Sequence, residues 1–176
     1  SLGLASFYDF SQVDRTRMAK QTSPTLLVTA AQTHLLLAEA AHRGWISVPA
    51  KEFYDHAVQR QMEEMAAYGE NTIIPEDQIA AYLSANPFDP NKALEQINTQ
   101  YWIASFLKGP EAFSNFRRSG FPALSPNPFS GQDISGDFIR RLTYPNSEIS
   151  VNSANVQEAI SRQGPDNLDT RVWWDK

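Results

Sequence analysis

Small and aliphatic residues recur at helical spacing between residues 23 and 44, and this pattern constrains the fold more than any other part of the chain. Ser23 can accept hydrogen bonds from the first free amides of a helix, and Pro24 suits its first position, so we expect the helix to begin there. Gly44 suits the left-handed conformation that ends a helix. The residues expected on its shared face are Leu27, Ala31, Leu35, Ala38 and Ala41. Five alanines between residues 30 and 41 would let another helix approach closely.

A second helix is predicted from Pro49 to about Gly69, and its inward face is expected to carry Phe53, Ala57, Met65 and Tyr68. The connection between the two helices is the short segment RGWISVP, which keeps them neighbours. The pair therefore predicts an antiparallel helical hairpin. Further helices are expected over residues 75–85, over 90–107 with Asp89 as the N-cap, and over 110–120.

We expect residues 1–176 to form a single unit that is mainly α, with TPR-like antiparallel helical hairpins and a loop-rich C-terminal segment. Its parts would be a loop-rich entry (1–22), the helical hairpins (23–120) and the C-terminal segment (121–176). This last part is predicted to contain a Pro-rich loop, a short extended stretch (138–144), a final helix (152–163) and a docked tail.

The composition excludes several classes of function. The net charge of -5 and the isoelectric point near 5.2 argue against binding to nucleic acid or to an anionic membrane, because both need clustered lysine and arginine. The sequence contains no cysteine, so it has no disulfide, thiol nucleophile or thiolate metal site. No apolar run approaches the ~18 residues that a membrane-spanning helix needs.

Three sequence blocks occur in an order that composition alone would not produce. They are THLLLAEAAHRGW at 33–45, YWIASFLKGPEAFSNFRRSGFPAL at 101–124 and FIRRLTYPNSEISVNSANVQEAISRQGPDNLDTRVWWDK at 138–176. Together they resemble the C-terminal portion, roughly the last third, of the SusD/RagB-like nutrient-binding outer-membrane lipoproteins of Bacteroidetes-type bacteria. The TPR-like assignment of the helices rests on this resemblance, because one hairpin cannot show a repeat.

The resemblance implies a function in polysaccharide utilisation. Such a protein would sit on the outer face of the cell outer membrane, held by a lipid on an upstream cysteine that this fragment lacks. It would capture an oligosaccharide or another nutrient and hand it to a TonB-dependent, SusC-like transporter, without any covalent step. Much of the ligand site would lie upstream of this sequence. The alternatives are a structural helical repeat that binds a protein or peptide, and a hydrolase.

The residues themselves give no positive argument for catalysis, a cofactor or a metal. His34 and His42 are eight residues apart, too far for the i, i+4 geometry of a helical metal site, and we expect His34 to be half-buried in a helix contact. The acidic pairs Glu63-Glu64 and Glu76-Asp77 diverge on a helix, whereas a glycosidase needs two opposed carboxylates. We therefore expect a protein that is not an enzyme.

Weak candidates for ligand binding lie in the entry segment. Phe7, Tyr8 and Phe10 could stack on sugar rings, and Arg15 could donate hydrogen bonds to hydroxyl groups. The alternative is that these aromatic residues dock the entry segment onto the core.

Two further groups are expected to be architectural. The four tryptophans are expected to be packing residues; they are Trp45, Trp102, Trp173 and Trp174. The doublet Arg140-Arg141 together with Glu148 predicts a buried arginine–carboxylate pair that orients the C-terminal segment.

Overall fold

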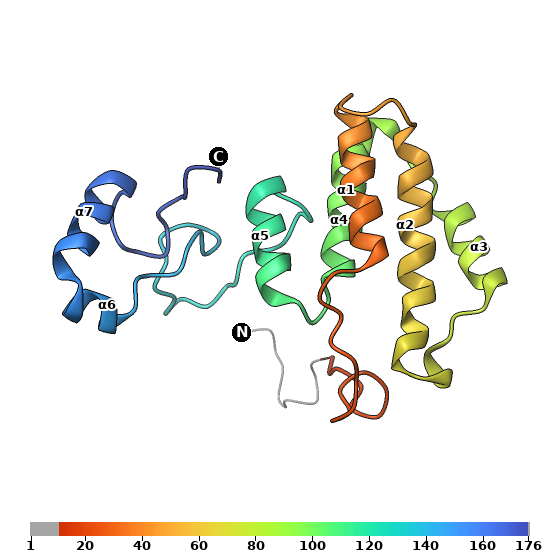
Figure 1. Cartoon of the computed structure of the whole chain (residues 1–176), viewed down its shortest axis with the longest axis horizontal. Helices are drawn as coiled ribbons and strands as arrows, with labels where there is room; N and C mark the ends of the chain where they lie inside the picture. Colours follow the sequence, from red (N-terminus) through yellow and green to blue (C-terminus); the bar gives the residue numbers. More distant parts are fainter. Residues whose placement is uncertain (1–10, 176) are drawn as a thin grey trace. The chain divides into compact units, whose positions relative to one another are not determined.

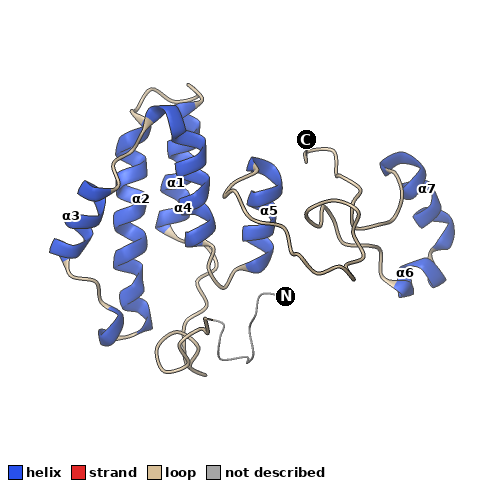
Figure 2. Cartoon of the chain, turned by 180° about the vertical axis from the view of Figure 1, so that it is seen from behind, coloured by secondary structure: helices blue, strands red, loops and turns tan. Residues whose placement is uncertain are grey.

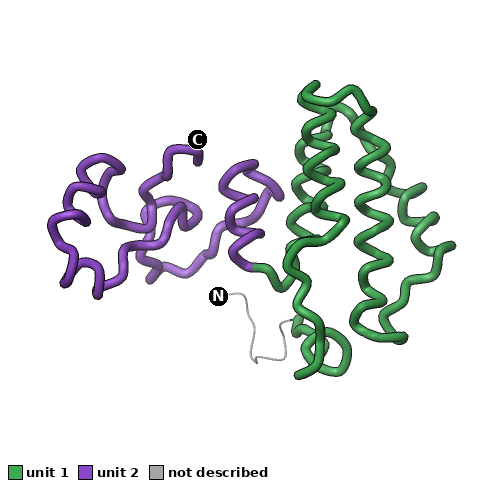
Figure 3. Tube along the Cα trace, in the orientation of Figure 1, with its two compact units in different colours: residues 1–108 green, residues 109–176 purple. Residues whose placement is uncertain are grey.

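The structure is a computed structural model that describes residues 11–175, and the chain divides into two compact units (Figure 3). We call residues 1–108 the N-terminal unit and residues 109–176 the C-terminal unit. Residues 11–175 contain helices and loops and no β-strand (Figure 2), so the predicted mainly α class is confirmed. The sequence predicted one unit whose helical part continues to residue 120, whereas the division falls after Lys108.

The first helix, α1, spans Ala30–His42 and so begins later than the predicted Ser23-Pro24. A reciprocal capping box fixes its start. Thr29 Oγ1 accepts a hydrogen bond from the backbone N–H of Gln32, and Gln32 Oε1 accepts one from the N–H of Thr29, each over 3.3 Å. The Ser23 hydroxyl does not cap a helix; it accepts a hydrogen bond from the N–H of Lys20 over 3.1 Å. The helix ends as predicted before Gly44, which has a φ of +75°.

Helix α2 spans Ala50–Glu64 and continues through the short 3-10 helix η2 (Met65–Tyr68) to Gly69, close to the predicted range. It runs antiparallel beside α1, as Figure 1 shows, which confirms the predicted hairpin. The contact is close because the facing positions are small. Ala31, Ala38 and Ala57 have no solvent exposure.

Two more helices complete the N-terminal unit. Helix α3 (Glu76–Ala85) packs on α2, and α4 (Ala93–Ala104) packs on both α1 and α2 (Figure 1). Short 3-10 helices lie in the connections, η3 (Glu70–Thr72) before α3 and η4 (Pro90–Lys92) before α4. Asp89 caps η4 as predicted, because its carboxylate accepts a hydrogen bond from the N–H of Asn91. The buried core consists of Leu35, Ala38, Tyr54, Ala57, Val58, Ala93, Ile97 and Tyr101.

The C-terminal unit contains α5 (Gly109–Ser119), α6 (Asn146–Val151) and α7 (Ser153–Gln163). The final helix lies within one residue of its predicted range, but α6 was not predicted. The expected extended stretch 138–144 is a loop, in which Arg140 N–H donates to the carbonyl of Leu168 over 2.7 Å. Pro145 ends that loop and is the N-cap of α6, and its carbonyl accepts a hydrogen bond from the N–H of Glu148 over 3.0 Å.

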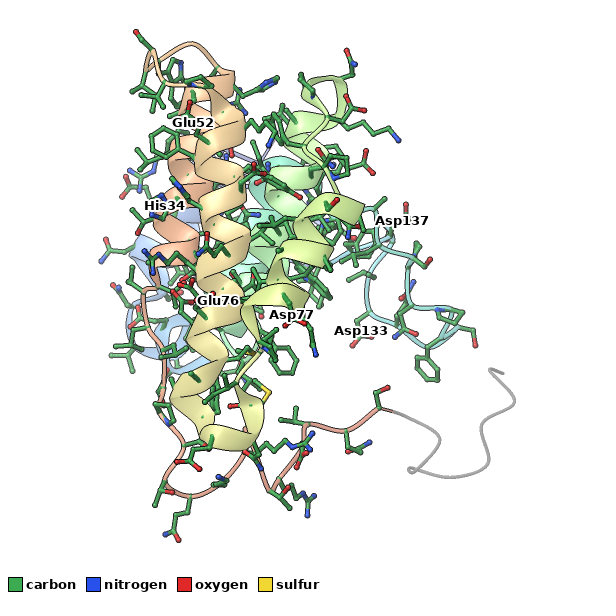
Figure 4. The ribbon with its side chains drawn as sticks, turned by 90° about the vertical axis from the view of Figure 1, so that its right-hand side faces the viewer. His34, Glu52, Glu76, Asp77, Asp133 and Asp137 are labelled. Atoms are coloured by element: carbon green, nitrogen blue, oxygen red, sulfur yellow. The ribbon has the colours of Figure 1, made fainter. Side chains whose placement is uncertain are left out.

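Asp169 holds the long loop of the C-terminal unit. Its carboxylate accepts hydrogen bonds from the backbone N–H groups of Ser135 (2.9 Å) and Gly136 (2.9 Å). These bonds favour the charged form and lower the pKa of Asp169 below its ordinary value of 3.8. Asp133 and Asp137 lie on the same loop (Figure 4).

The core of the N-terminal unit can be tested with two neighbouring leucines. Leu35 is 1% exposed, whereas Leu36 is 49% exposed. We expect Leu35→Ala to lower the free energy of unfolding by about 2–5 kcal/mol, because it removes buried methyl groups and leaves a cavity. Leu36→Ala should change it by less than about 0.5 kcal/mol. Urea unfolding measures both, and equal losses would contradict this packing.

The Asp169 contact predicts a pH dependence. Because its pKa is lowered in the folded state, the contact stabilises the loop fully above pH 3.8 and is lost as the pH falls through the folded-state pKa. In an NMR titration the amide signals of Ser135 and Gly136 should move together in this acidic range. Asp169→Asn should abolish that transition, and the control Asp133→Asn should leave it in place. A transition that survives Asp169→Asn would rule the contact out.

Candidate functional site

The N-terminal unit contains a cavity of about 260 Å³, which lies between the entry segment, the end of α2 and the end of α4. Its wall combines polar and apolar groups. The residues that matter for binding chemistry are Lys20, Thr29, Glu64, Tyr68, Phe106 and Lys108. The volume is close to the lower limit of ~300 Å³ for sites that hold small molecules, so an occupant must be a small group.

A buried hydrogen-bond network fixes the polar wall of this cavity. Lys108 Nζ donates to Gln32 Oε1 over 2.9 Å, and Gln32 Nε2 donates to Ser105 Oγ over 3.2 Å. Glu64 Oε1 accepts a hydrogen bond from the N–H of Ala31 over 3.3 Å. The side chains of the two charged residues are therefore held in place by the first turn of α1, which the capping box defines.

A strained turn brings Lys108 to the network. Leu107 has a φ of 65°, in the left-handed region that a branched residue rarely adopts, at a cost of about 1–2 kcal/mol. The turn is closed by a hydrogen bond of 2.8 Å from the N–H of Lys108 to the carbonyl of Ser105. It leaves Phe106 53% exposed at the cavity. An exposed ring beside fixed polar groups can stack on a sugar ring while its hydroxyls are hydrogen-bonded.

Of the four predicted ligand-binding residues, the structure describes Arg15. Phe7, Tyr8 and Phe10 lie outside the described residues. Arg15 is exposed on the entry segment and does not line the cavity. Beside it, Asp14 accepts hydrogen bonds from the hydroxyl (2.7 Å) and the N–H (2.8 Å) of Thr16, which lower the pKa of Asp14. Sequence patterns missed Glu64 and Lys108, because only the fold places them near each other.

The tryptophans do not all pack as predicted. Trp45 is 73% exposed and Trp173 is 87% exposed, so the expectation is wrong for these two, and Trp102 is also exposed. Trp45 lies in the connection after α1, where the guanidinium of Arg43 is its ring contact at 5.6 Å. Only Trp174 is partly buried.

The histidines and acidic pairs give no catalytic arrangement within the described residues. His34 is half-buried beside Phe53 and His56, with ring centroids 6.1 and 5.8 Å away, which confirms the predicted helix contact. No group of three or more potential metal ligands occurs in residues 11–175. Glu76 and Asp77 lie at the start of α3, away from Glu52 near the start of α2 (Figure 4). Among the same residues, no helix has the length and apolar character needed to cross a membrane.

Two arginine–aspartate pairs hold the end of the chain in the C-terminal unit. Arg140 is paired with Asp175, and Arg141 Nη2 lies 2.8 Å from Asp166 Oδ1. The prediction that Glu148 is the partner carboxylate is wrong, because Glu148 accepts a hydrogen bond from the side chain of Asn152 at the end of α6. The doublet was a correct signal for buried pairing, but the partner carboxylates come from the tail that follows α7.

Comparison with known proteins identifies the family. A family model described as "Starch-binding associating with outer membrane" (SusD-like) matches residues 2–145. The chain belongs to this SusD-like family. No curated protein matches the chain.

Solved structures are similar to this SusD-like chain over most of its length. A chitin-binding protein is 38% identical over 82% of the chain, with a TM-score of 0.78, and a Bacteroidetes SusD-like protein (AC2a) is 33% identical over 89%, with a TM-score of 0.80. A chitin-binding SusD homologue from Flavobacterium johnsoniae is 31% identical over 85%, with a TM-score of 0.71. The SusD-like chain spans about one third of the length of these proteins, 32%, 32% and 36% respectively.

The pair between Arg141 and Asp166 predicts a large effect on stability in this SusD-like chain. Both side chains are mostly buried, with 7% and 14% exposure, so Arg141→Ala leaves a carboxylate without its main partner. We expect a loss of about 3 kcal/mol in thermal or urea unfolding. Arg162→Ala is the matched stability control, because its pair with Glu158 is exposed and worth at most about 1 kcal/mol. Affinity that falls at unchanged stability would contradict an architectural role.

Proposed function

We propose that the protein binds a neutral oligosaccharide at the cell surface without modifying it. The observation that carries this proposal is membership of the SusD-like family together with two chitin-binding relatives, at 38% and 31% identity. The cavity of the N-terminal unit supports it with one exposed aromatic ring and a fixed set of hydrogen-bonding groups. Chitin oligosaccharides are the first ligands to test.

The proposed role within the cell follows the family. The protein would be an outer-membrane lipoprotein that passes its ligand to a SusC-like, TonB-dependent transporter. The sequence printed above contains no cysteine, so the lipid-bearing residue of this proposal lies outside it. The helical hairpins would act as a rigid support for the binding surface, because their core is continuous from α1 through α4.

The second candidate is a helical module that binds a protein or peptide. Exposed apolar side chains favour it, since Leu27 and Val28 are 78% and 82% exposed before α1. Exposed apolar side chains mark interaction surfaces when they form a contiguous patch, and these two are adjacent in the chain. The two functions differ in the ligand that is bound, and one experiment separates them.

Isothermal titration with soluble chitin oligosaccharides tests the first function, with malto-oligosaccharides as a second series. We expect saturable binding to at least one series. Phe106→Ala should weaken it about two- to tenfold, since loss of one stacked ring is worth about 0.5–1.5 kcal/mol. Phe129→Ala is the matched control, because Phe129 is 63% exposed and does not line the cavity. A folded protein that binds neither series would refute the proposal and favour the module that binds a polypeptide.

A further inference from the structure

The C-terminal unit contains a larger groove that the sequence did not predict. It has a volume of about 610 Å³ and lies between α7, the loop before α6 and the end of the chain. Its aromatic and hydrogen-bonding lining residues include Tyr144, Arg162, Gln163, Arg171, Trp173 and Trp174. Its volume falls within the range of ~300–1,000 Å³ that is typical of small-molecule sites, whereas the cavity of the N-terminal unit falls just below it.

Trp173 presents its indole to solvent from a fixed backbone. The next residue, Trp174, lies under the guanidinium of Arg117, 4.7 Å from the ring centroid. Asp175 is buried, and its carboxylate accepts hydrogen bonds from Arg140 Nε (2.8 Å) and Arg171 Nη1 (3.2 Å). Its N–H also donates to the carbonyl of Val172 over 2.9 Å, which closes a turn around Trp173. The side chain of Trp173 is therefore exposed on an ordered turn, and its exposure does not result from fraying of the backbone.

A fixed, exposed indole is suited to binding. The backbone that carries it is held in place, so a ligand that stacks on the ring does not have to order a mobile segment. Trp and Tyr also combine an apolar ring face with a polar group, which matches the apolar face and the hydroxyl rim of a pyranose ring. Tyr144 contributes to the groove and is itself held by Arg141, whose guanidinium lies 4.9 Å from its ring centroid.

The charges of the groove favour a neutral ligand. Both arginines are paired with carboxylates, Arg162 with Glu158 at 2.9 Å and Arg171 with Asp175 at 3.2 Å. The pairs offset the positive charge, but each guanidinium has five N–H donors and keeps some of them for a ligand. Gln163 adds an amide donor and acceptor. Uncharged hydroxyl or acetamido groups can use these donors, while an anion would find no unpaired cation among these residues.

We propose that this groove is a carbohydrate subsite in which Trp173 stacks on one sugar ring of a neutral oligosaccharide. The proposal rests on the proposed function and adds a second place of contact, in the C-terminal unit. Gln163 and the two paired arginines donate hydrogen bonds to the ring substituents. Tryptophan-to-phenylalanine replacement keeps a ring but reduces its area, so it should retain part of the affinity.

The experiment compares Trp173→Ala, Trp173→Phe and Trp45→Ala in the full chain. Trp45 is the matched control, because it is also a strongly exposed tryptophan but lies outside the groove. Titration calorimetry and tryptophan fluorescence with soluble chitin oligosaccharides give the affinities, and thermal unfolding gives the stabilities. We expect Trp173→Ala to weaken binding at least tenfold at an unchanged melting temperature. The affinity of Trp173→Phe should lie between those of Trp173→Ala and the wild type, and the affinity of Trp45→Ala should equal that of the wild type.

The outcomes separate this inference from the proposed function. Equal affinity of Trp173→Ala and the wild type would overturn the subsite while leaving oligosaccharide binding in place. A wild-type protein that binds no oligosaccharide would overturn both. A lower melting temperature for Trp173→Ala, or the loss of a dimer in light scattering, would mean that polypeptide covers the indole, and this would also overturn the subsite.

Discussion

The N-terminal unit depends on the close approach of α1, α2 and α4, which small buried side chains make possible. Packed helix axes lie ~8–10 Å apart, and small residues at the contact allow the shorter distances of this range. Ala31, Ala38 and Ala57 are fully buried, and Ala93 is 2% exposed. The cavity is walled by the last turns of α2 and α4, so this packing sets its width. A larger residue at one of these positions would separate the helices and also displace the Gln32 network.

The C-terminal unit is stabilised in a different way. Within residues 109–175 the one buried apolar side chain is Val156, while Asn115, Arg141 and Asp175 are buried polar residues. Charge-assisted hydrogen bonds therefore provide much of the stability of this unit, whereas burial of apolar side chains provides it in the N-terminal unit. Such pairs are directional and fix side-chain positions closely. The unit can hold the backbone at Trp173 in place although it buries little apolar surface.

The accuracy of the sequence predictions follows this difference. Where apolar residues recur at helical spacing, as in α2 and α4, the helices lie close to their predicted ranges. The start of α1 was misplaced because Ser23-Pro24 and Thr29 are both plausible caps, and only the reciprocal bond with Gln32 selects the second. In the C-terminal unit the contacts join residues 25 to 35 positions apart. No local pattern indicates which aspartate will meet Arg140 or Arg141.

The two adjacent tryptophans show the same limit at the candidate site. Trp173 and Trp174 have the same side chain in almost the same local sequence, yet one is largely exposed and the other lies against Arg117. Asp175, which follows both, is held by Arg140 and Arg171, so the backbone at this end of the unit is fixed by contacts that the local sequence does not reveal. The net charge of -5 also bears on what the exposed indole can bind. An acidic chain repels acidic glycans at long range, and the paired arginines do not restore a positive field, so electrostatics and groove chemistry both favour a neutral sugar.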